Sequence, residues 1–500
     1  MNVHADEESD EAIGAEKRPN NGGMPPAEAV EQRTSPKGNG RQTAAARTLR
    51  RSPASNGLAA VRQAAQRNKQ TRFTALLHHI TVDLLKQSFH ALERNAAPGI
   101  DGVTWHAYRE ENLEGKLSDL HDRIHRGSYR ARPAKRTYIP KSDGSQRPLD
   151  ILCLEDKIVQ QAAVYVLEAI YEADFLGFSY GFRPGRGQHD ALDALYAGLM
   201  RKKVDWVLDA DIQGFFSAMS HDWTMRFLEH RIADKRILRL IAKWLKVGVV
   251  TKEGRIERST RGAPQGAVVS PILANVYLHY ALDLWAHRWR QNKARGDVII
   301  IRYADDFIAG FQHEHEARAF LQDLHERLRE FELALHPAKT RLIRFGRFAA
   351  EQRKKRGEGK PETFDFLGFT HFCTRSKAGG FVIGRKTIKK RMVAKLKALK
   401  VELRKRMHDS IAATGEWLNL LLKGHLNYFA VPGNSLSLWW FFHEIRWRWL
   451  RSLRRRSQKA NLNWGKFHRL TDRFFPPIKI LHPQPLHRFD ARTQGRSPVR

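Results

Sequence analysis

Cysteine is scarce in this chain of 500 residues, which contains only Cys153 and Cys373. Two cysteines cannot form a disulfide framework, and by themselves they cannot supply a four-ligand zinc site. No stretch approaches the roughly 18 consecutive apolar residues of a membrane span, and the first residues lack the apolar region of a secretory signal. These absences exclude a disulfide-stapled secreted protein, and we expect a cytoplasmic protein with no membrane contact.

Acidic residues are also in short supply. The chain has 87 Lys and Arg against 53 Asp and Glu, a formal net charge of +34. A surplus of this size usually serves a polyanion and disfavours a free-standing metabolic enzyme. Hydrophobic residues make up 42% of the chain, enough for real cores, and the length predicts two or three domains. We therefore expect a folded, basic protein that binds nucleic acid.

The first 70 residues have the composition of a tail. They are rich in Ala, Gly, Pro, Asn, Ser and charged residues, and they show no lasting periodicity. Such a segment cannot bury enough apolar surface to offset its ordering entropy. Its start is acidic and its later part is basic, so two interpretations stay open: a solvated linker, or an arm that contacts RNA.

The rest of the chain mixes the two hydrophobic periods of regular secondary structure. Apolar positions recur at helical spacing in some segments, and short apolar runs typical of strands lie between them. This mixture predicts an α+β body rather than a helical bundle. We expect helices at 73–92, 271–287 and 385–406, strands at 206–212 and 298–303, and a hairpin over 135–151.

The strongest chemical signal is the pair Asp305 and Asp306, within IIRYADDFI at 300–308. Strand-like stretches flank Ala304 and Asp305, which predicts a hairpin with adjacent aspartates at its tip. Neighbouring carboxylates repel each other unless cations compensate them. Mg²⁺ prefers such oxygen ligands, and two metal ions about 3.5–4 Å apart stabilise the attacking and leaving oxygens of phosphoryl transfer. We therefore expect two Mg²⁺ ions here.

A third carboxylate is needed to bridge such a pair of ions. VLDADIQGFF at 207–216 offers candidates at the end of an apolar strand. Alternation places Asp209 and Asp211 on the same face of that strand. The residues alone do not decide which of the two is the ligand.

These motifs resemble those of a known family. YADD at 303–306 resembles the catalytic box of reverse transcriptases, and DIQGFF at 211–216 resembles their first aspartate motif. RGAPQGAVVSPILAN at 261–275 is similar to their segment between the two boxes. Order and spacing agree over about 85–372, and the resemblance is closest to group II intron reverse transcriptase/maturases. Supporting motifs are NAAPGIDG at 95–102, YIPK at 138–141, RPL at 147–149, GFRPG at 181–185 and FLGF at 366–369.

The resemblance implies roles for individual residues. Asp211, Asp305 and Asp306 take the metal-binding and catalytic roles, with Asp209 beside them. Phe216 matches the bulky residue that leaves no room for a ribose 2′-OH, which favours dNTPs over NTPs.

Further residues match the nucleotide site of that family. Two cations suit a triphosphate, one as a point charge and one as a planar fork. A glycine allows close backbone approach to the nascent base pair. The expected nucleotide-binding residues are Lys141, Arg147, Phe216, Gln265, Gly266 and Tyr303.

The C-terminal part is basic and aromatic. Residues 385–406 carry eleven Lys or Arg against one Glu, which resembles the thumb that grips a template–primer duplex. Residues 438–456 interleave arginines with an apolar helical stripe, and the surroundings of 424–428 resemble the maturase domain that binds the intron and assists its splicing. Aromatic and guanidinium planes also suit unstacked RNA bases. The expected RNA-binding residues are Arg385, Lys389, Lys390, Arg446, Arg448, Arg451, Arg454 and Arg455.

The resemblance implies a right-hand polymerase with an appended helical part. We expect a tail at 1–70, fingers and palm at 71–372, a thumb at 373–410, a maturase-like RNA-binding domain at 411–490 and a tail at 491–500. The implied function is an RNA-directed DNA polymerase that copies intron RNA and assists group II intron splicing. The implied partners are dNTPs, an RNA template, a DNA primer, target DNA and the intron RNA, in a bacterial cytoplasm.

Other interpretations stay open. No Cys/His-rich segment follows residue 486, so we expect no endonuclease module and no second-strand cut by this protein. One rival function is an RNA-binding splicing cofactor whose polymerase activity has lapsed, which the intact Asp211, Asp305 and Asp306 disfavour. Another is a domesticated reverse transcriptase of a retron, diversity-generating or defence system, which the maturase-like residues after Gly424 disfavour.

Overall fold

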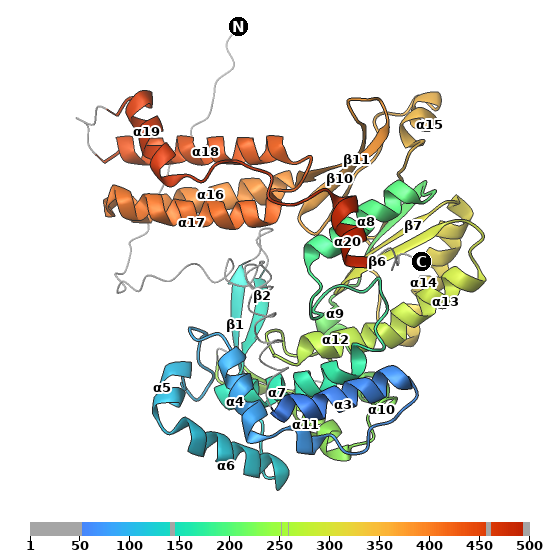
Figure 1. Ribbon diagram of the computed structural model, residues 1–500, viewed down its shortest axis with the longest axis vertical. Helices are drawn as coiled ribbons and strands as arrows, with labels where there is room; N and C mark the ends of the chain where they lie inside the picture. Colours follow the sequence, from blue (N-terminus) through green and yellow to red (C-terminus); the bar gives the residue numbers. More distant parts are fainter. Residues whose placement is uncertain (1–52, 141–145, 252, 259, 457–461, 494–500) are drawn as a thin grey trace.

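The computed structural model describes residues 53–140, 146–251, 253–258, 260–456 and 462–493 (Figure 1). In these residues, helices surround three sheets, two of four strands and one of three. Neighbouring strands are antiparallel except for β1 and β4. The predicted α+β class is therefore confirmed. None of the helices described is long and apolar enough to cross a membrane.

The first part of the structure is a helical cluster that carries a hairpin. Its central helix is α7 (Leu154–Tyr171), which is buried along most of its length because apolar residues occur on all its sides. The hairpin of β1 (Ala134–Pro140) and β2 (Gln146–Ile151) rises from the cluster towards the C-terminal helices (Figure 1) and confirms the predicted hairpin. The other elements are η1 (Leu77–His79), α4 (Val82–Ala91), α5 (Trp105–Glu110), α6 (Leu113–His125), α10 (His221–Glu229), α11 (Lys235–Lys246), β4 (Val249–Val250) and β5 (Ile256–Glu257).

The expected tail at 1–70 is wrong for its last part. Residues Pro53–Arg67 form the helix α3, which packs against α7. Leu58, Val61 and Ala65 lie on one face of α3 and are buried. Low average hydrophobicity over the first 70 residues concealed this short amphipathic stretch, in which only one face needs to be apolar. Residues 1–52 lie outside the described part.

The central sheet has the strand order β6-β7-β3-β8 and is antiparallel throughout. Its strands are β6 (Val298–Tyr303), β7 (Asp306–Phe311), β3 (Trp206–Asp211) and β8 (Arg341–Arg344). The two strands predicted at 206–212 and 298–303 are both present. The continuous run of Val and Ile in β6 matches a sheet that is covered on both faces.

Helices cover the two faces of this sheet. Leu208 and Ala210 belong to the core that contains α14 (Glu314–Glu330), whereas Val207 belongs to the core that contains α8 (Gln188–Arg201). Since successive side chains of a strand point to opposite faces, Asp209 and Asp211 lie on the α8 face. The α14 face is also covered by α12 (Ser270–Leu278), the π-helical turn η2 (His279–Asp283) and α13 (Leu284–Asn292).

The C-terminal part contains a small sheet and a helical lobe. The sheet has β9 (Phe364–Phe366), β10 (Phe369–Arg375) and β11 (Phe381–Thr387), and the helix α15 (Ala349–Lys355) precedes it. The lobe packs apolar faces of four helices into one core (Figure 1). The helices are α16 (Lys389–Lys405), α17 (Ile411–Phe429), α18 (Ser435–Arg454) and α19 (Trp464–Phe474), with the short turn η3 (Arg406–His408) after α16.

Two expected boundaries differ from the structure. The predicted division between palm and thumb at 372 and 373 falls inside β10, because the β10–β11 hairpin continues to Thr387. The helix predicted over 385–406 begins at Lys389. The last helix, α20 (Pro485–Thr493), returns to α8, where Asp490 accepts two hydrogen bonds of 2.8 and 2.7 Å from Arg201.

Candidate active site

The β6–β7 hairpin carries the paired aspartates at its tip, as the sequence predicts. Tyr303 pairs with Asp306, which leaves Ala304 and Asp305 as a two-residue turn. Ala304 has a φ of 56°, a left-handed conformation that non-glycine residues seldom adopt. Asp305 is half-buried, and Asp306 is exposed at the start of β7.

The neighbouring strand carries a third carboxylate at the same end of the sheet, and its register distinguishes the two candidates that the sequence leaves open. Asp211 lies directly opposite Asp306 in the β3–β7 ladder, whereas Asp209 lies opposite Ile308. Directly opposed residues of an antiparallel pair have Cβ atoms about 4.5–5.5 Å apart and share one face. Asp211, Asp305 and Asp306 therefore gather at the same end of the sheet. Asp209 lies one pleat further away, with an Oδ2 atom 3.4 Å from Arg341.

Crowding of negative charge changes the acidity of these groups. Desolvation, followed by the negative charges of Asp305 and Asp211, raises the pKa of Asp306 to about 7. Because Asp306 is exposed, we regard repulsion by the other carboxylates as the more important cause. The pKa of Asp305 is also raised, by burial and by Asp211. An anionic cluster of this kind stabilises cations in its centre.

Cations from three parts of the chain compensate this cluster. Lys339 forms an ion pair of 2.8 Å with Asp211, and the positive charges of Arg147 and Lys339 offset part of the rise in the pKa of Asp305. The charge of Arg391 in α16 offsets part of the rise in the pKa of Asp306. The carboxylates therefore lie where the β2 strand, the central sheet and the first helix of the C-terminal lobe come together. Lys339 and Arg391 were not among the residues expected from the sequence.

The chain path explains the position of Lys339. The backbone of 334–336 runs beside the end of β3, where the N–H of His336 donates to the carbonyl of Asp211 at 2.8 Å. Lys339 follows directly and reaches the Asp211 carboxylate. The two residues are 128 positions apart in the sequence, so no local sequence pattern predicts the contact.

The donor set fits a hard divalent cation. Three carboxylates offer the oxygen ligands that Mg²⁺ prefers. The raised pKa values of Asp305 and Asp306 indicate negative charge that the neighbouring cations do not fully compensate. Within the described ranges, however, no three Asp, Glu, His or Cys side chains converge closely enough to hold a metal ion. Lys339 occupies one oxygen of Asp211, so a metal that binds here competes with that ammonium group.

Phe216 and Tyr303 lie close in the chain to the carboxylates. Phe216 belongs to α9 (Phe215–Ala218), which begins just after β3, and its half-buried ring lies 6.4 Å from that of Phe182. Tyr303 is the last residue of β6, and burial together with Asp306 raises its pKa to about 12. Tyr303 therefore lies at the edge of the anionic cluster, opposite Asp306, and the role of Phe216 stays a prediction.

Gln265 and Gly266 lie against the hairpin of the first part. The Gln265 carbonyl accepts from the Asp150 N–H at 2.6 Å, and the Gln265 N–H donates to the Asp150 carboxylate at 3.2 Å. Gly266 has a φ of 111°, and a Cβ atom there would lie 2.8 Å from the Asp150 carbonyl oxygen. Only glycine allows this close approach. Arg147 is exposed on β2, and Lys141 lies outside the described residues.

The expected RNA contact Arg385 is wrong. Arg385 lies in β11, is only 2% exposed and pairs with the buried Asp193 at 3.6 Å. The sequence pattern fails here because the basic residues of α16 follow closely on those at the end of β11. Lys389 and Lys390 are exposed in the first turn of α16.

The arginines of α18 divide into two groups. Arg446 and Arg448 are half-buried, with Arg446 over the ring of Phe475 and Arg448 paired with Glu444. Arg451, Arg454 and Arg455 are exposed, and Arg454 donates to the Leu462 carbonyl. Exposed cations at the end of α18 are therefore better placed for a polyanion than those in its middle.

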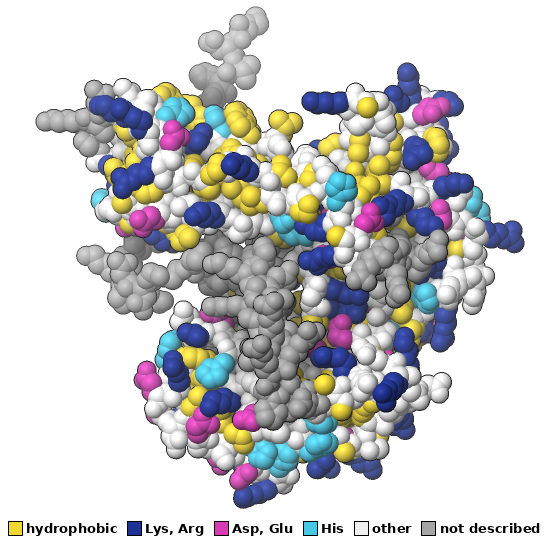
Figure 2. All heavy atoms as spheres, viewed as in Figure 1, with side chains coloured by type: hydrophobic (Ala, Val, Ile, Leu, Met, Phe, Trp, Pro, Cys, Tyr) yellow, Lys and Arg dark blue, Asp and Glu magenta, His cyan; other side chains and the backbone are white. Residues whose placement is uncertain are grey.

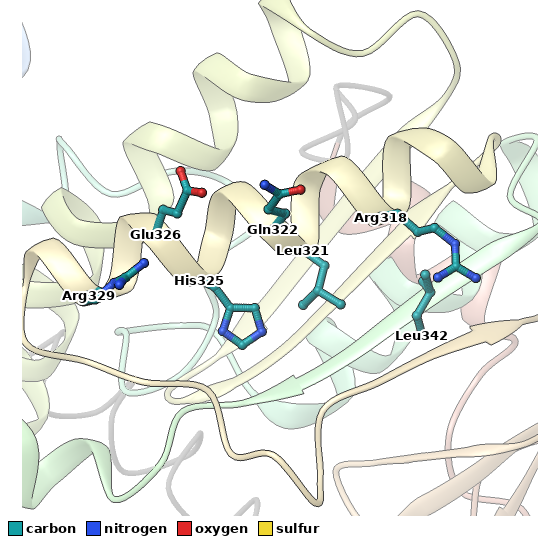
Figure 3. A pocket seen from close by; sticks show the side chains of 7 residues that line it. All are labelled: Arg318, Leu321, Gln322, His325, Glu326, Arg329 and Leu342. Atoms are coloured by element: carbon teal, nitrogen blue, oxygen red, sulfur yellow. The ribbon is translucent and has the colours of Figure 1, made fainter.

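One further cavity lies away from these residues. It has a volume of about 480 Å³ and lies between α14 and β8 (Figure 3). Leu342 lines it and occupies the sheet face opposite Arg341, hence opposite the carboxylates. The lining residues are Arg318, Leu321, Gln322, His325, Glu326, Arg329 and Leu342.

Comparison with known proteins agrees with this geometry. Residues 139–371 match the family model described as reverse transcriptase (RNA-dependent DNA polymerase). The chain is similar to the protein YkfC of Escherichia coli, with 35% identity over 42% of this chain and 62% of that protein. It is also similar to an uncharacterized 91 kDa protein in the cob intron of Schizosaccharomyces pombe, with 37% identity over 39% of this chain and 24% of that protein.

A third relative carries the family name that the motifs predict. The group II intron-encoded protein LtrA of Lactococcus lactis subsp. cremoris is 31% identical over 44% of this chain and 37% of that protein. The chain thus spans less than two thirds of the length of each of these three relatives. The matches confirm the resemblance that the sequence motifs predict.

Proposed function

We propose that this chain, in which residues 139–371 form a reverse transcriptase domain of the group II intron type, copies RNA into DNA. The observation that carries the proposal is the position of Asp211 opposite Asp306 and beside the turn of Asp305. A pure RNA-binding protein of net charge +34 gains nothing from such a cluster of negative charge.

In this proposal, Asp211, Asp305 and Asp306 hold two Mg²⁺ ions. The ions would supply charge stabilisation to the oxygens of nucleotidyl transfer. The chain's own groups do the remaining work. Arg147 on β2 and Lys141 would hold the triphosphate, and Arg391 adds positive charge from the C-terminal lobe. Catalysis would rest on positioning and electrostatics.

The pocket for the incoming nucleotide would be formed by side chains on both sides of the cluster. Phe216 would exclude a ribose 2′-OH, because its ring is backed by Phe182 and Phe215. Gln265 and Gly266 would line the nascent base pair, because Gln265 is hydrogen-bonded to Asp150 and Gly266 packs directly against the Asp150 backbone.

We also propose that the C-terminal lobe binds structured intron RNA and assists splicing, with target DNA as a further partner. Exposed aromatic rings on α18 and α19 support this role. Hydrophobic side chains lie among Lys and Arg on the surface of this lobe (Figure 2). Trp439 stacks on His443 with ring centroids 5.2 Å apart, and Trp464 meets Trp447 at 4.8 Å. Such rings with neighbouring arginines suit unpaired bases. We propose a bacterial cytoplasm as the location, in line with the two bacterial relatives.

Primer extension on an RNA template with dNTPs and Mg²⁺ tests the polymerase. We expect extension by the wild type and its loss in the double variant Asp305→Asn/Asp306→Asn, with RNA binding unchanged. A folded wild type that binds RNA but extends no primer would favour the rival function, an RNA-binding splicing cofactor.

A further inference from the structure

Arg302 lies behind the turn that carries the catalytic aspartates. It is completely buried on β6, and every N–H of its guanidinium group has a partner. Two bonds of 2.7 and 2.6 Å go to the carboxylate of Asp283. The others go to the Asn275 side chain at 3.2 Å, the Ser179 hydroxyl at 2.7 Å and the Ala304 carbonyl at 3.0 Å. An arginine has five such donors, so none is left over.

The four partners come from different parts of the chain. Asp283 ends the π-helical turn η2 between α12 and α13, and Asn275 lies in α12. A π-helical turn changes the direction in which the following residues point, and such turns occur often at functional sites. Ser179 belongs to a segment that pairs with Arg302 along the outer edge of β6, the edge that does not face β7. Arg302 therefore joins the helices behind the sheet to its edge.

The bond to Ala304 connects this group to the active site. Alternation along β6 places the Arg302 side chain on the α14 face, opposite the face of Asp306 and Asp211. A planar peptide fixes the following N–H opposite the carbonyl, so holding the Ala304 carbonyl also fixes the backbone of Asp305. The left-handed φ of Ala304 is strained for a residue with a side chain and persists only where its surroundings enforce it.

Gly181 reinforces the same turn. A Cβ atom at Gly181 would lie 2.3 Å from the backbone nitrogen of Ala304, so the two backbones are in direct contact. The Gly181 carbonyl accepts from the Asn275 side chain at 2.8 Å, and Asn275 in turn accepts from Arg302. Two contacts therefore hold the turn: the hydrogen bond from Arg302 to the Ala304 carbonyl, and the backbone of Gly181, which packs against Ala304.

We propose that Arg302 is a positioning residue for the polymerase reaction, with Asp283, Asn275 and Ser179 as its supports. It holds the Ala304–Asp305 peptide so that Asp305 and Asp306 present their carboxylates together with Asp211 despite their mutual repulsion. This inference rests on the proposed function, because its benefit is to metal binding and nucleotidyl transfer at that site. It assigns a task to a buried ion pair that contacts neither nucleotide nor RNA.

The competing explanation is that Arg302 and Asp283 merely stabilise the fold. The chain offers a matched control for it. Arg231 and Asp174 form a second buried ion pair, 3.0 Å apart and 3% and 7% exposed, which lies by α3 and does not touch the turn. Breaking either pair leaves a buried arginine without its carboxylate partner, so both changes are expected to destabilise the protein.

The experiment compares Asp283→Asn and Ser179→Ala with the control Asp174→Asn in the full chain. Three measurements are made: Mn²⁺ affinity without substrates by electron paramagnetic resonance, primer-extension kinetics that give kcat and KM for a dNTP, and thermal unfolding that gives the melting temperature. The Mn²⁺ signal of the Asp305→Asn/Asp306→Asn variant defines binding elsewhere on the chain.

We expect Asp283→Asn to lower kcat by about 10- to 100-fold with little change in KM, because a displaced catalytic group reacts more slowly. Its Mn²⁺ affinity at the aspartates should fall by about 10-fold, as for other groups that orient metal ligands. Asp174→Asn should lower the melting temperature by a similar amount and leave Mn²⁺ affinity and kcat unchanged. Ser179→Ala removes one of the five hydrogen bonds of Arg302 and should lower kcat and Mn²⁺ affinity by a smaller factor. If Asp283→Asn does not fold, Ser179→Ala tests the role of Arg302 in its place.

The inference is overturned if Asp283→Asn and Ser179→Ala change only the melting temperature, as the control does. It is also overturned if the wild type binds no more Mn²⁺ than the double aspartate variant. If the wild type extends no primer, the proposed function fails, but the Mn²⁺ comparison still decides whether Arg302 positions the aspartates.

Discussion

Asp211 and Asp306 are direct partners in the antiparallel ladder between β3 and β7. Their side chains share one face at the end of the sheet, with Asp305 in the adjacent turn. Desolvation, together with repulsion by Asp305 and Asp211, raises the pKa of Asp306 to about 7. The fold therefore holds together charges that would separate on their own, which is the condition for a site that binds cations.

Phe216→Ala should allow ribonucleotides to be incorporated. The half-buried ring of Phe216 is backed by Phe182, so its removal opens space and the neighbouring side chains do not fill it. The preference for dTTP over UTP, measured as the ratio of kcat/KM values, should fall by about 10- to 200-fold, the range for discrimination by one small group in an apolar pocket. An unchanged ratio would show that Phe216 does not form the gate.

Gly266→Ala should raise KM for dNTPs. The new Cβ atom would lie 2.8 Å from the Asp150 carbonyl oxygen, at a φ of 111° that disfavours any side chain, so the segment must move off β2. Gly359→Ala is the matched control, because a Cβ atom there meets nothing within 4 Å. Equal KM values in the two variants would contradict the role of Gly266.

Trp439→Ala and Trp447→Ala should weaken binding of single-stranded RNA without loss of folding. Trp439 is 59% exposed and makes a stack with His443, which offers a flat surface to an unpaired base. Each stacked base contributes about 1–3 kcal/mol, so Kd should rise by roughly 5- to 150-fold for each variant. Leu436→Ala removes a more exposed but aliphatic side chain and should leave Kd unchanged. If Leu436→Ala weakens RNA binding equally, the rings do not act by stacking.

His425→Phe should stabilise the protein, and more so in acid. The His425 ring lies between Phe429 and Phe441, neither ring nitrogen has a partner among the described residues, and burial, followed by the charge of Lys395, lowers its pKa well below 6.5. His425 therefore binds a proton in the unfolded chain but not in the folded chain, and the free energy of unfolding falls as pH drops below about 6.5.

Urea unfolding of both proteins at pH 7.5 and 5.5 measures this effect. The free energy of unfolding of His425→Phe relative to wild type should be larger at pH 5.5 than at pH 7.5 by about 1.4 kcal/mol. This is the value for one group whose pKa in the unfolded chain lies one pH unit above the lower pH. A difference that does not depend on pH would show that His425 titrates with the same pKa in the folded and unfolded states.

The sequence predicts the centre of the site better than its surroundings. The strands of Asp211 and of the aspartate pair are visible because apolar residues lead directly into contiguous aspartate motifs. The choice of Asp211 over Asp209 needs the register of β3 against β7, which no single strand reveals. Lys339 and Arg391 reach the site from segments that only the tertiary fold brings there.

A sequence pattern predicts wrongly where it continues past a structural boundary. Basic residues run from β11 into α16, so the pattern predicts an exposed helix at Arg385, which is buried in a strand. The helix α3 shows the opposite case, since three apolar residues on one face, Leu58, Val61 and Ala65, have little effect on the average composition of a polar segment. The network around Arg302 leaves no sequence signal beyond its separate motifs.

Single-turnover primer extension on an RNA template by Asp211→Asn and Asp209→Asn tests the account most directly. The two residues lie two positions apart on the same face of β3, but only Asp211 is opposite Asp306. We expect Asp211→Asn to slow extension on the order of 10²–10³-fold, the loss typical of one essential electrostatic contact, and Asp209→Asn to stay within about 10-fold of wild type. Rapid extension by Asp211→Asn, or equal losses in both variants, would contradict a reaction centred on Asp211, Asp305 and Asp306.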